Sequence, residues 1–267
     1  MIGVIIGDIV GSVYEFDNIK TKDFPLFSRE CDFTDDSIMS LAVARALLEC
    51  KGKRFEDETL KKAFAAYMKW YGRQYPYPMG GYGGRFGDWL RSCENEPYNS
   101  WGNGSAMRVA ACGFAAKDLN EALRFAELSS SVTHNHPEAI AGAKAVAACI
   151  YMAKSGLDKE YIHQYVHRYY YPLDMSLDEI RKTYTFTERC KDTVPQAIQA
   201  FLEAKDFEDA IRNAISIGGD SDTIGAITGG IAEAYFGVSN DLRGDAESYL
   251  PDDLFYVLKK FEETYQN

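Results

Sequence analysis

Residues 1–12 read MIGVIIGDIVGS, an apolar stretch in which Gly3, Gly7 and Gly11 are four positions apart. The same four-residue spacing of glycines recurs in the apolar stretch TIGAITGGIAEAYFG, residues 223–237. A glycine in a helix interior costs about 1 kcal/mol relative to alanine. We therefore expect these helices to cross other helices closely, in a tightly packed core.

Helical periodicity dominates the rest of the chain. In DETLKKAFAAYMKWYG, residues 57–72, the apolar side chains recur at helix spacing. Pro137 suits the first turn of a later helix, and Gly156 suits its end. Alternating strand patterns are scarce. The sequence predicts an all-α fold of roughly a dozen helices, in one domain over residues 1–267.

One region departs from this pattern. YPYPMGGYGGRFGDW, residues 75–89, is rich in proline, glycine and aromatic residues, so a loop is predicted there. The loop could close over a ligand as a lid, or it could simply connect two helices. The residues alone leave both interpretations open.

The composition excludes several function classes. The chain has 267 residues, a net charge of −11 and no basic stripe, so we expect neither a nucleic-acid nor a membrane partner. None of the six cysteines forms a CxxC pair, which favours free thiols in a reducing compartment. Residues 1–12 lack the basic region of a signal peptide, and no apolar run reaches membrane-helix length. We expect a soluble, cytoplasmic protein.

Paired carboxylates mark the start of one predicted helix. In FTDDSIMS, residues 33–40, Asp35 and Asp36 precede an apolar run. Thr34 is a good N-cap, and acidic residues in a first turn complement the helix dipole. Helix capping is sufficient to explain this segment on its own.

The pattern is repeated in GGDSDTIG, residues 218–225, where Asp220, Asp222 and Thr223 begin a second apolar helix. If the two segments converge in a dry pocket, their four carboxylates repel one another unless cations neutralise them. These ligands are all hard oxygens without nearby histidine or cysteine, which favours Mg²⁺, Mn²⁺ or Ca²⁺ over Zn²⁺. No calcium-loop motif is present, so we predict a pair of magnesium ions.

Three further segments have open interpretations. Glu15, after the first apolar helix, is either an exposed chain end or a proton-transfer group. SWGNGSAMRVAA, residues 100–111, is predicted to open a helix, and its glycines make either a phosphate-binding loop or an ordinary turn. Trp101 could stack on a base or pack. His134 alone favours a capping or core histidine, and the helix-spaced pair His163 and His167 is assigned to a helix surface.

Together these segments resemble the ADP-ribosylglycohydrolase family. The resemblance rests on five motifs in family order, from residue 7 to residue 234. They are GDIVGSVYE, FTDDS, GNGSAMR, THNHPEAIAGA and GGDSDTIGAITGGIAEA. The pair formed by TDDS and the distal GGDSDTIGA is the most specific part of this signature.

The resemblance implies a compact orthogonal bundle of helices around a central binuclear site with two Mg²⁺ ions, or Mn²⁺ in their place. It implies cleavage of the bond between ADP-ribose and an acceptor, in an ADP-ribosylated protein or a small molecule. The implied metal ligands are Thr34, Asp35, Asp36, Asp220, Asp222 and Thr223. The implied substrate-binding residues are Ser100, Trp101, Gly102, Asn103, Gly104 and His134.

The acceptor is set by the branch of the family. Glu15 matches the catalytic glutamate of the branch that acts on serine-linked and other O-linked ADP-ribose, so this linkage, or a small-molecule ester, is our first expectation. The arginine-directed branch relies on aspartates instead, and Asp88 has no motif support for that role. A non-catalytic ADP-ribose-binding or structural relative is a third alternative, and the presence of all six matched metal ligands argues against it. A metal phosphohydrolase is the fourth, and the chain lacks the HD pair such enzymes use.

Overall fold

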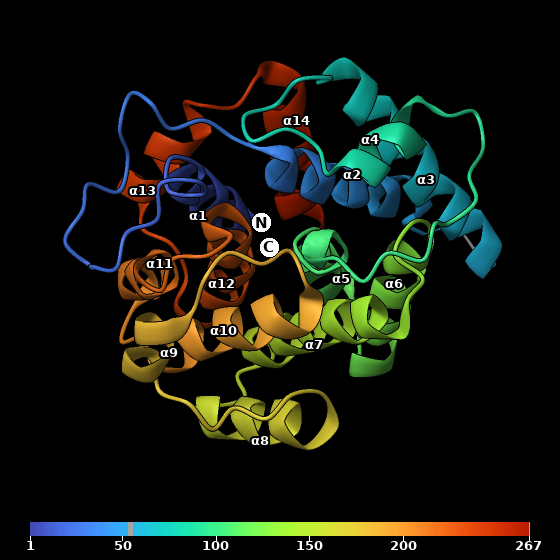
Figure 1. Cartoon of the computed structure of the whole chain (residues 1–267). Coiled ribbons are helices and arrows are strands. Elements are labelled where there is room, and N and C mark those ends of the chain that lie inside the picture. The colour runs from blue at the N-terminus through green and yellow to red at the C-terminus, as the bar shows by residue number, and fades with distance from the viewer. Residues whose placement is uncertain (53–55, 267) are drawn as a thin grey trace.

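The computed structural model describes residues 1–52 and 56–266, and this part of the chain is a bundle of helices (Figure 1). Fourteen α-helices and one 3-10 turn occur in it. They are α1 (Ile2–Ser12), α2 (Asp35–Cys50), α3 (Asp57–Gln74), α4 (Gly84–Arg91), η1 (Asn103–Ser105), α5 (Ala110–Ala115), α6 (Leu119–Ser131), α7 (Pro137–Lys154), α8 (Lys159–Tyr169), α9 (Leu177–Thr183), α10 (Cys190–Leu202), α11 (Phe207–Ser216), α12 (Ser221–Phe236), α13 (Asn240–Glu247) and α14 (Asp252–Tyr265). Within the described ranges, extended pairing is limited to two isolated bridges. The prediction of an all-α fold is confirmed.

Helices α1 and α12 cross at the centre of the bundle (Figure 1). A Cβ atom at Gly7 would lie 1.9 Å from the carbonyl oxygen of Gly225, and one at Gly3 would lie 2.3 Å from that of Gly229. Side chains never approach backbone so closely, so only glycine permits this crossing. The close helix crossing predicted from glycine spacing is confirmed.

Local capping residues set where several helices begin. Thr34 precedes α2 and accepts a hydrogen bond from the amide of Asp36. Pro137 occupies the first turn of α7, as predicted, because a proline there loses no intrahelical bond. The cap of α7 is His136, whose Nδ1 accepts from the Glu138 amide. These caps fix the helix starts that surround the site described below.

The prediction of a loop over residues 75–89 is wrong in its second half. Helix α4 begins at Gly84, and its residues Phe86, Trp89 and Leu90 are buried. Burial of this apolar face outweighs the helix cost of the glycines, which no local pattern could show. The remaining loop is residues 75–83, which we call the strap.

The cysteines and helix lengths agree with the composition. Cys31, Cys112, Cys149 and Cys190 are buried free thiols, and Cys93 is an exposed one. For these five cysteines the prediction of free thiols is confirmed. Among the helices of the described residues, none combines the length and apolar character needed to cross a bilayer.

The central crossing can be tested by substitution. Gly7→Ala should destabilise the fold by about 3 kcal/mol, because the new methyl group meets the backbone of α12 and neither helix can yield. Gly244→Ala is the matched control: the site lies in α13, and an added Cβ would meet nothing within 4 Å. That change should stabilise the protein by up to about 1 kcal/mol. Urea unfolding measures both, and equal effects would contradict the crossing.

Candidate metal centre and active site

The two acidic segments meet inside the protein. Asp8, Asp36 and Asp222 place carboxylate oxygens within 4.8 Å of one another, and so do Glu15, Asp220 and Asp222. These residues come from α1, from the segment after it, and from the N-terminal ends of α2 and α12. Asp222 belongs to both groups, so the two groups form one continuous acidic cluster.

Burial raises the pKa of every member of this cluster, and repulsion between carboxylates adds to the shift for all members except Asp8. For Asp36 and Asp222 the pKa lies well above the usual range, because burial and then neighbouring aspartates disfavour the charged form. The pKa of Asp220 is raised to about 6 by burial. The pKa of Glu15 is raised to about 8 by burial, with Asp222 adding to the shift.

The donor set fits divalent cations. Asp36 Oδ1 is buried, and the described residues give it no hydrogen-bond partner. A buried carboxylate oxygen without a partner is costly, and a cation would satisfy it. The donors of the cluster are all hard oxygens, which suits Mg²⁺ or Mn²⁺.

Asp8 is a member of the cluster that the motifs did not single out. It is fully buried and accepts hydrogen bonds from the Thr34 amide at 2.9 Å and the Ser37 amide at 3.0 Å. Its carboxylate thereby caps the first turn of α2 from outside the helix. The one available signal was a charged residue within eleven otherwise uncharged ones.

The two threonines proposed as metal ligands differ in their surroundings. Thr34 Oγ1 donates to Asp8 Oδ1 at 2.6 Å and accepts from the Asp36 amide at 3.2 Å, so most of its bonding capacity is used. Thr223 Oγ1 donates to Asp36 Oδ2 at 3.3 Å and lines the cavity. The ligand roles of both remain predictions.

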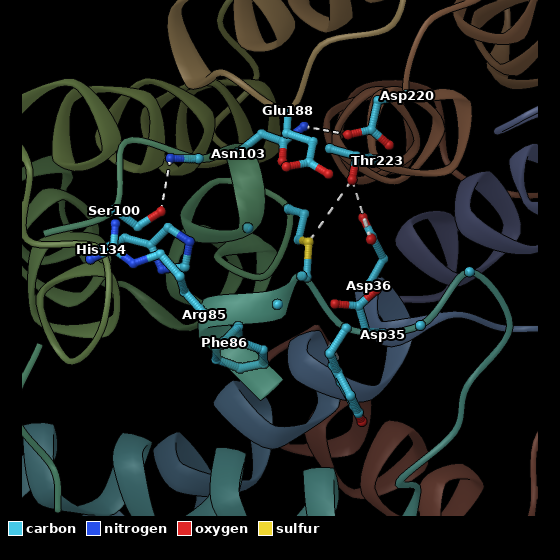
Figure 2. Close-up of a pocket in the computed structure, with 18 of the residues that line it drawn as sticks. Asp35, Asp36, Arg85, Phe86, Ser100, Asn103, His134, Glu188, Asp220 and Thr223 are labelled. Carbon is cyan, nitrogen blue, oxygen red and sulfur yellow. Dashed lines mark hydrogen bonds between the residues drawn. The ribbon is translucent and has the colours of Figure 1, made fainter. Parts of the chain in front are cut away.

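The cluster forms one wall of a cavity of about 470 Å³, a size typical of small-molecule sites. Figure 2 shows Asp35, Asp36 and Asp220 on one side of this space and Arg85 and His134 on the other. The predicted residues that line it are Glu15, Asp35, Asp36, Ser100, Trp101, Gly102, Asn103, Gly104, His134, Asp220, Asp222 and Thr223. Thr34 is the predicted site residue that the lining omits.

The segment after Trp101 does not open a long helix as predicted. Residues Asn103–Ser105 form the 3-10 turn η1, and α5 begins only at Ala110. The turn is held by specific bonds: the Gly102 amide donates to Ser100 Oγ at 3.1 Å, and Asn103 Nδ2 donates to Asp220 Oδ2 at 2.6 Å. The loop therefore positions a carboxylate of the acidic cluster, a role the sequence did not indicate.

Aromatic and charged residues surround the mouth of the cavity. Trp101 is 47% exposed and lies under the guanidinium of Arg189, 5.6 Å from the ring centre. Phe16 is 75% exposed and lines the cavity as well. Glu188 and Arg85 also line it, and no motif had marked them. An exposed ring at a cavity mouth can stack on a flat ligand.

The strap crosses directly over Glu15. Gly80 has a φ of +73°, and a Cβ atom there would lie 2.6 Å from Glu15 Oε2. The strap is attached to the bundle through Tyr75, whose hydroxyl donates to Asp253 at 2.5 Å. Within the strap, the Tyr82 hydroxyl donates to the Tyr75 carbonyl at 2.9 Å. Glycine at position 80 lets the backbone approach the glutamate closely.

The fold and the site together define an all-helical protein with an acidic, partly enclosed cavity whose donors suit divalent cations. The sequence comparisons give its family. A sequence model described as ADP-ribosylglycohydrolase matches residues 1–253. The chain belongs to the ADP-ribosylglycohydrolase family, whose members are hydrolases acting on the glycosidic bond of ADP-ribose.

Similar proteins include an ADP-ribosylarginine hydrolase and an ADP-ribosylhydrolase. The chain is 29% identical to ADP-ribosylarginine hydrolase Tri1 of Pseudomonas putida (strain GB-1), over 90% of this chain and 70% of the relative. It is 26% identical to ADP-ribosylhydrolase ARH3 of Gallus gallus, over 88% of this chain and 83% of the relative. A solved ADP-ribosylglycohydrolase-related protein complex has the same fold, with a TM-score of 0.70 and 21% identity over 99% of this chain and 95% of that one.

Cation binding makes a prediction about stability. Saturating Mg²⁺ should stabilise the wild-type protein by about 2.7 kcal/mol at 100 times the dissociation constant, because the ions bind only the folded cluster. Asp36→Asn should raise the melting temperature in chelator, since it removes one buried negative charge, and should abolish most of the Mg²⁺ effect. The control is Asp88→Asn, whose carboxylate is exposed on α4 and paired with Arg91. Thermal melts with Mg²⁺ and with chelator test this, and a full Mg²⁺ effect in Asp36→Asn would contradict it.

Proposed function

We propose that this protein is a Mg²⁺-dependent hydrolase that releases ADP-ribose from an oxygen-linked acceptor, either a serine side chain or a small-molecule ester. One observation carries the proposal: Glu15 lies beside the acidic starts of α2 and α12, in a cavity that also holds the Gly102–Gly104 loop. The substrate is an ADP-ribosylated protein or an ADP-ribose-containing small molecule, and the protein acts in the cytoplasm.

The acidic wall supplies the metal-binding part of the site. Asp35, Asp36, Asp220, Asp222 and Thr223 would hold two divalent ions, with Asp8 orienting the start of α2 beneath them. When bound, such ions neutralise the carboxylates and act as Lewis acids toward a water or a substrate oxygen. Asn103 keeps Asp220 in place through its 2.6 Å hydrogen bond, so the substrate loop and the metal wall share one side chain.

Glu15 is the proton-transfer group of the proposal. Its half-buried carboxyl lies next to Asp222 and Asp220 and against Gly80 of the strap, and it lines the cavity. A carboxyl in that place can pass a proton between its Oε atom and the attacking water or the leaving oxygen. Cleavage of a sugar C1″–O bond through an oxocarbenium-like state requires that transfer.

The opposite wall supplies recognition of the ADP group. The Gly102–Gly104 loop and His134 would bind the diphosphate, and Trp101, at the rim, would stack on the adenine. Arg85 and Arg108 place positive charge near His134. Holding both ends of the ligand fixes the sugar bond against the catalytic wall, a positioning effect.

Arginine-linked ADP-ribose is the second candidate. It is favoured by the similarity to ADP-ribosylarginine hydrolase Tri1 and by Glu188, an exposed carboxylate at the cavity that could pair with a guanidinium. The two candidates differ in the bond cleaved, so a panel of linkages separates them.

The deciding experiment is such a panel. Peptides carrying ADP-ribose on serine and on arginine, together with a small ADP-ribosyl ester, are incubated with the protein in Mg²⁺ and in chelator. We expect release from the oxygen-linked substrates in Mg²⁺ and loss of release in chelator. Release from arginine alone would overturn the first candidate in favour of the second. Binding of ADP-ribose without turnover on any linkage would identify a non-catalytic relative instead.

Glu15→Gln separates binding from chemistry. Glutamine keeps the shape of the side chain but cannot exchange a proton, so turnover should fall by at least about 10²-fold. ADP-ribose affinity should stay within about threefold, since the amide removes one negative charge and no recognition contact. Single-turnover kinetics and calorimetry measure the two quantities. Unchanged turnover would remove Glu15 from the role assigned to it.

A further inference from the structure

Arg108 is a fully buried cation on the recognition side of the cavity. It donates to the Ser129 carbonyl at 3.0 Å and to Thr133 Oγ1 at 2.8 Å, and the described residues give it no ion pair. Burial lowers the pKa of Arg108 to about 10, so the guanidinium remains charged at neutral pH. A buried charge whose hydrogen-bond acceptors are neutral is costly. The position of Arg108 relative to His134 suggests what this buried charge is for.

The hydrogen-bond directions around Thr133 are constrained. A guanidinium has donors only, so Thr133 Oγ1 must accept from Arg108. The single hydrogen of the threonine hydroxyl is then available for His134 Nδ1, which lies 2.7 Å away. The second lone pair of Thr133 Oγ1 would also allow Nδ1–H to donate, with the hydroxyl hydrogen directed to Tyr98. When Nδ1 accepts from Thr133 instead, the proton of the imidazole is on Nε2.

Electrostatics favours the arrangement in which His134 Nδ1 accepts from Thr133 and Nε2 carries the proton. Burial, and then the positive charges of Arg108 and Arg85, lower the pKa of His134 well below its usual value, so the ring is neutral. The positive guanidinium of Arg108 lies behind Thr133 and therefore favours a lone pair, not a proton, on Nδ1, the nitrogen of the neutral ring that faces Thr133.

The other ring nitrogen faces the substrate loop. A Cβ atom at Gly104 would lie 3.2 Å from His134 Nε2, and one at Gly102 would lie 3.6 Å from it. Glycines at these positions therefore leave the Nε2 side of the ring uncovered. Figure 2 shows His134 beside Ser100 and Arg85, on the side of the cavity opposite the carboxylates.

We propose that Arg108 and Thr133 are positioning residues that hold His134 as the Nε2–H tautomer, so that this N–H donates to an oxygen of the diphosphate of the bound ligand. The identity of that ligand as ADP-ribose rests on the proposed function. The direction of the relay, from Arg108 through Thr133 to His134, is a property of this chain without ligand. A histidine of the opposite tautomer would present a lone pair to the phosphate and repel it.

The tautomer is measured directly in the wild-type protein. Long-range ¹H–¹⁵N correlation spectra at neutral pH distinguish an Nε2–H ring, an Nδ1–H ring and an imidazolium. The chain has four histidines, so the His134 signal is assigned by its loss in His134→Gln. We expect the Nε2–H form. The Nδ1–H form, in which Thr133 would donate to a neighbour such as Tyr98, or an imidazolium, would overturn the proposal without any functional assay.

Substitution of the relay tests its effect on binding. Thr133→Val keeps the shape but removes the hydroxyl, and should weaken ADP-ribose binding on the order of tenfold as the His134 spectrum shifts toward mixed tautomers. Thr133→Ser restores the hydroxyl and should restore both the spectrum and the affinity. Ser131→Ala is the control: this residue is two positions away, its hydroxyl donates to the Leu128 carbonyl, and the change should affect neither quantity.

The outcomes separate the relay from the proposed function. If Thr133→Val binds ADP-ribose as tightly as Thr133→Ser, with both folded by circular dichroism, the relay does not position the histidine and the proposal fails. If the wild type shows the Nε2–H tautomer but binds no ADP-ribose, the proposed function fails and, with it, the assignment of the acceptor oxygen to that ligand. A spectrum of the Nδ1–H tautomer together with tight ADP-ribose binding would contradict the relay and leave the proposed function standing.

Discussion

The backbone contact between α1 and α12 is the constraint on which the site depends. Gly3 and Gly7 lie directly against carbonyl groups of α12, and these contacts fix the position of each helix along the other. Gly11 continues it: a Cβ atom there would lie 2.5 Å from the Asp222 Cα. The end of α1 is thereby placed at the start of α12, and Glu15, a few residues later, reaches Asp222. A shift by one residue would turn a carboxylate away from the cluster.

A second constraint is electrostatic, because the fold brings together carboxylates that repel one another. The Asp8 carboxylate illustrates the conflict: it accepts three hydrogen bonds from Thr34 and Ser37, yet burial still raises its pKa to about 6. Such a cluster is unfavourable for folding by itself. The close packing of α1 on α12 at their glycines buries apolar surface, and the free energy of that burial offsets the electrostatic cost of the cluster.

The sequence predicted the features that depend on local chemistry. Helical periodicity, the N-cap at Thr34 and the four-residue glycine spacing each follow from neighbouring residues, and the structure agrees with them. Features set by distant contacts were missed or wrong. Helix α4 forms because Trp89 is buried against other elements, and the turn η1 is held by the bond from Asn103 to Asp220, 117 positions away. The two acidic segments predicted the carboxylates of the site, and the motifs predicted the Ser100–Gly104 loop and His134 on the opposite wall. The positive charge that Arg85 and Arg108 add to that wall was not predicted.

That opposite wall changes what the cavity can bind. A protein with a net charge of −11 and a wall of carboxylates repels anions, and a cavity with that wall alone would favour cations only. Arg85 lies across the space from that wall (Figure 2), and Arg108 is linked through Thr133 to His134 on the same side. The electrostatic potential therefore changes sign across the width of one small molecule. A ligand suited to such a field has anionic groups at one end and neutral hydroxyls, able to approach metal ions, at the other. Neither wall alone would select it, because the acidic one rejects the phosphates and the basic one cannot hold the cations.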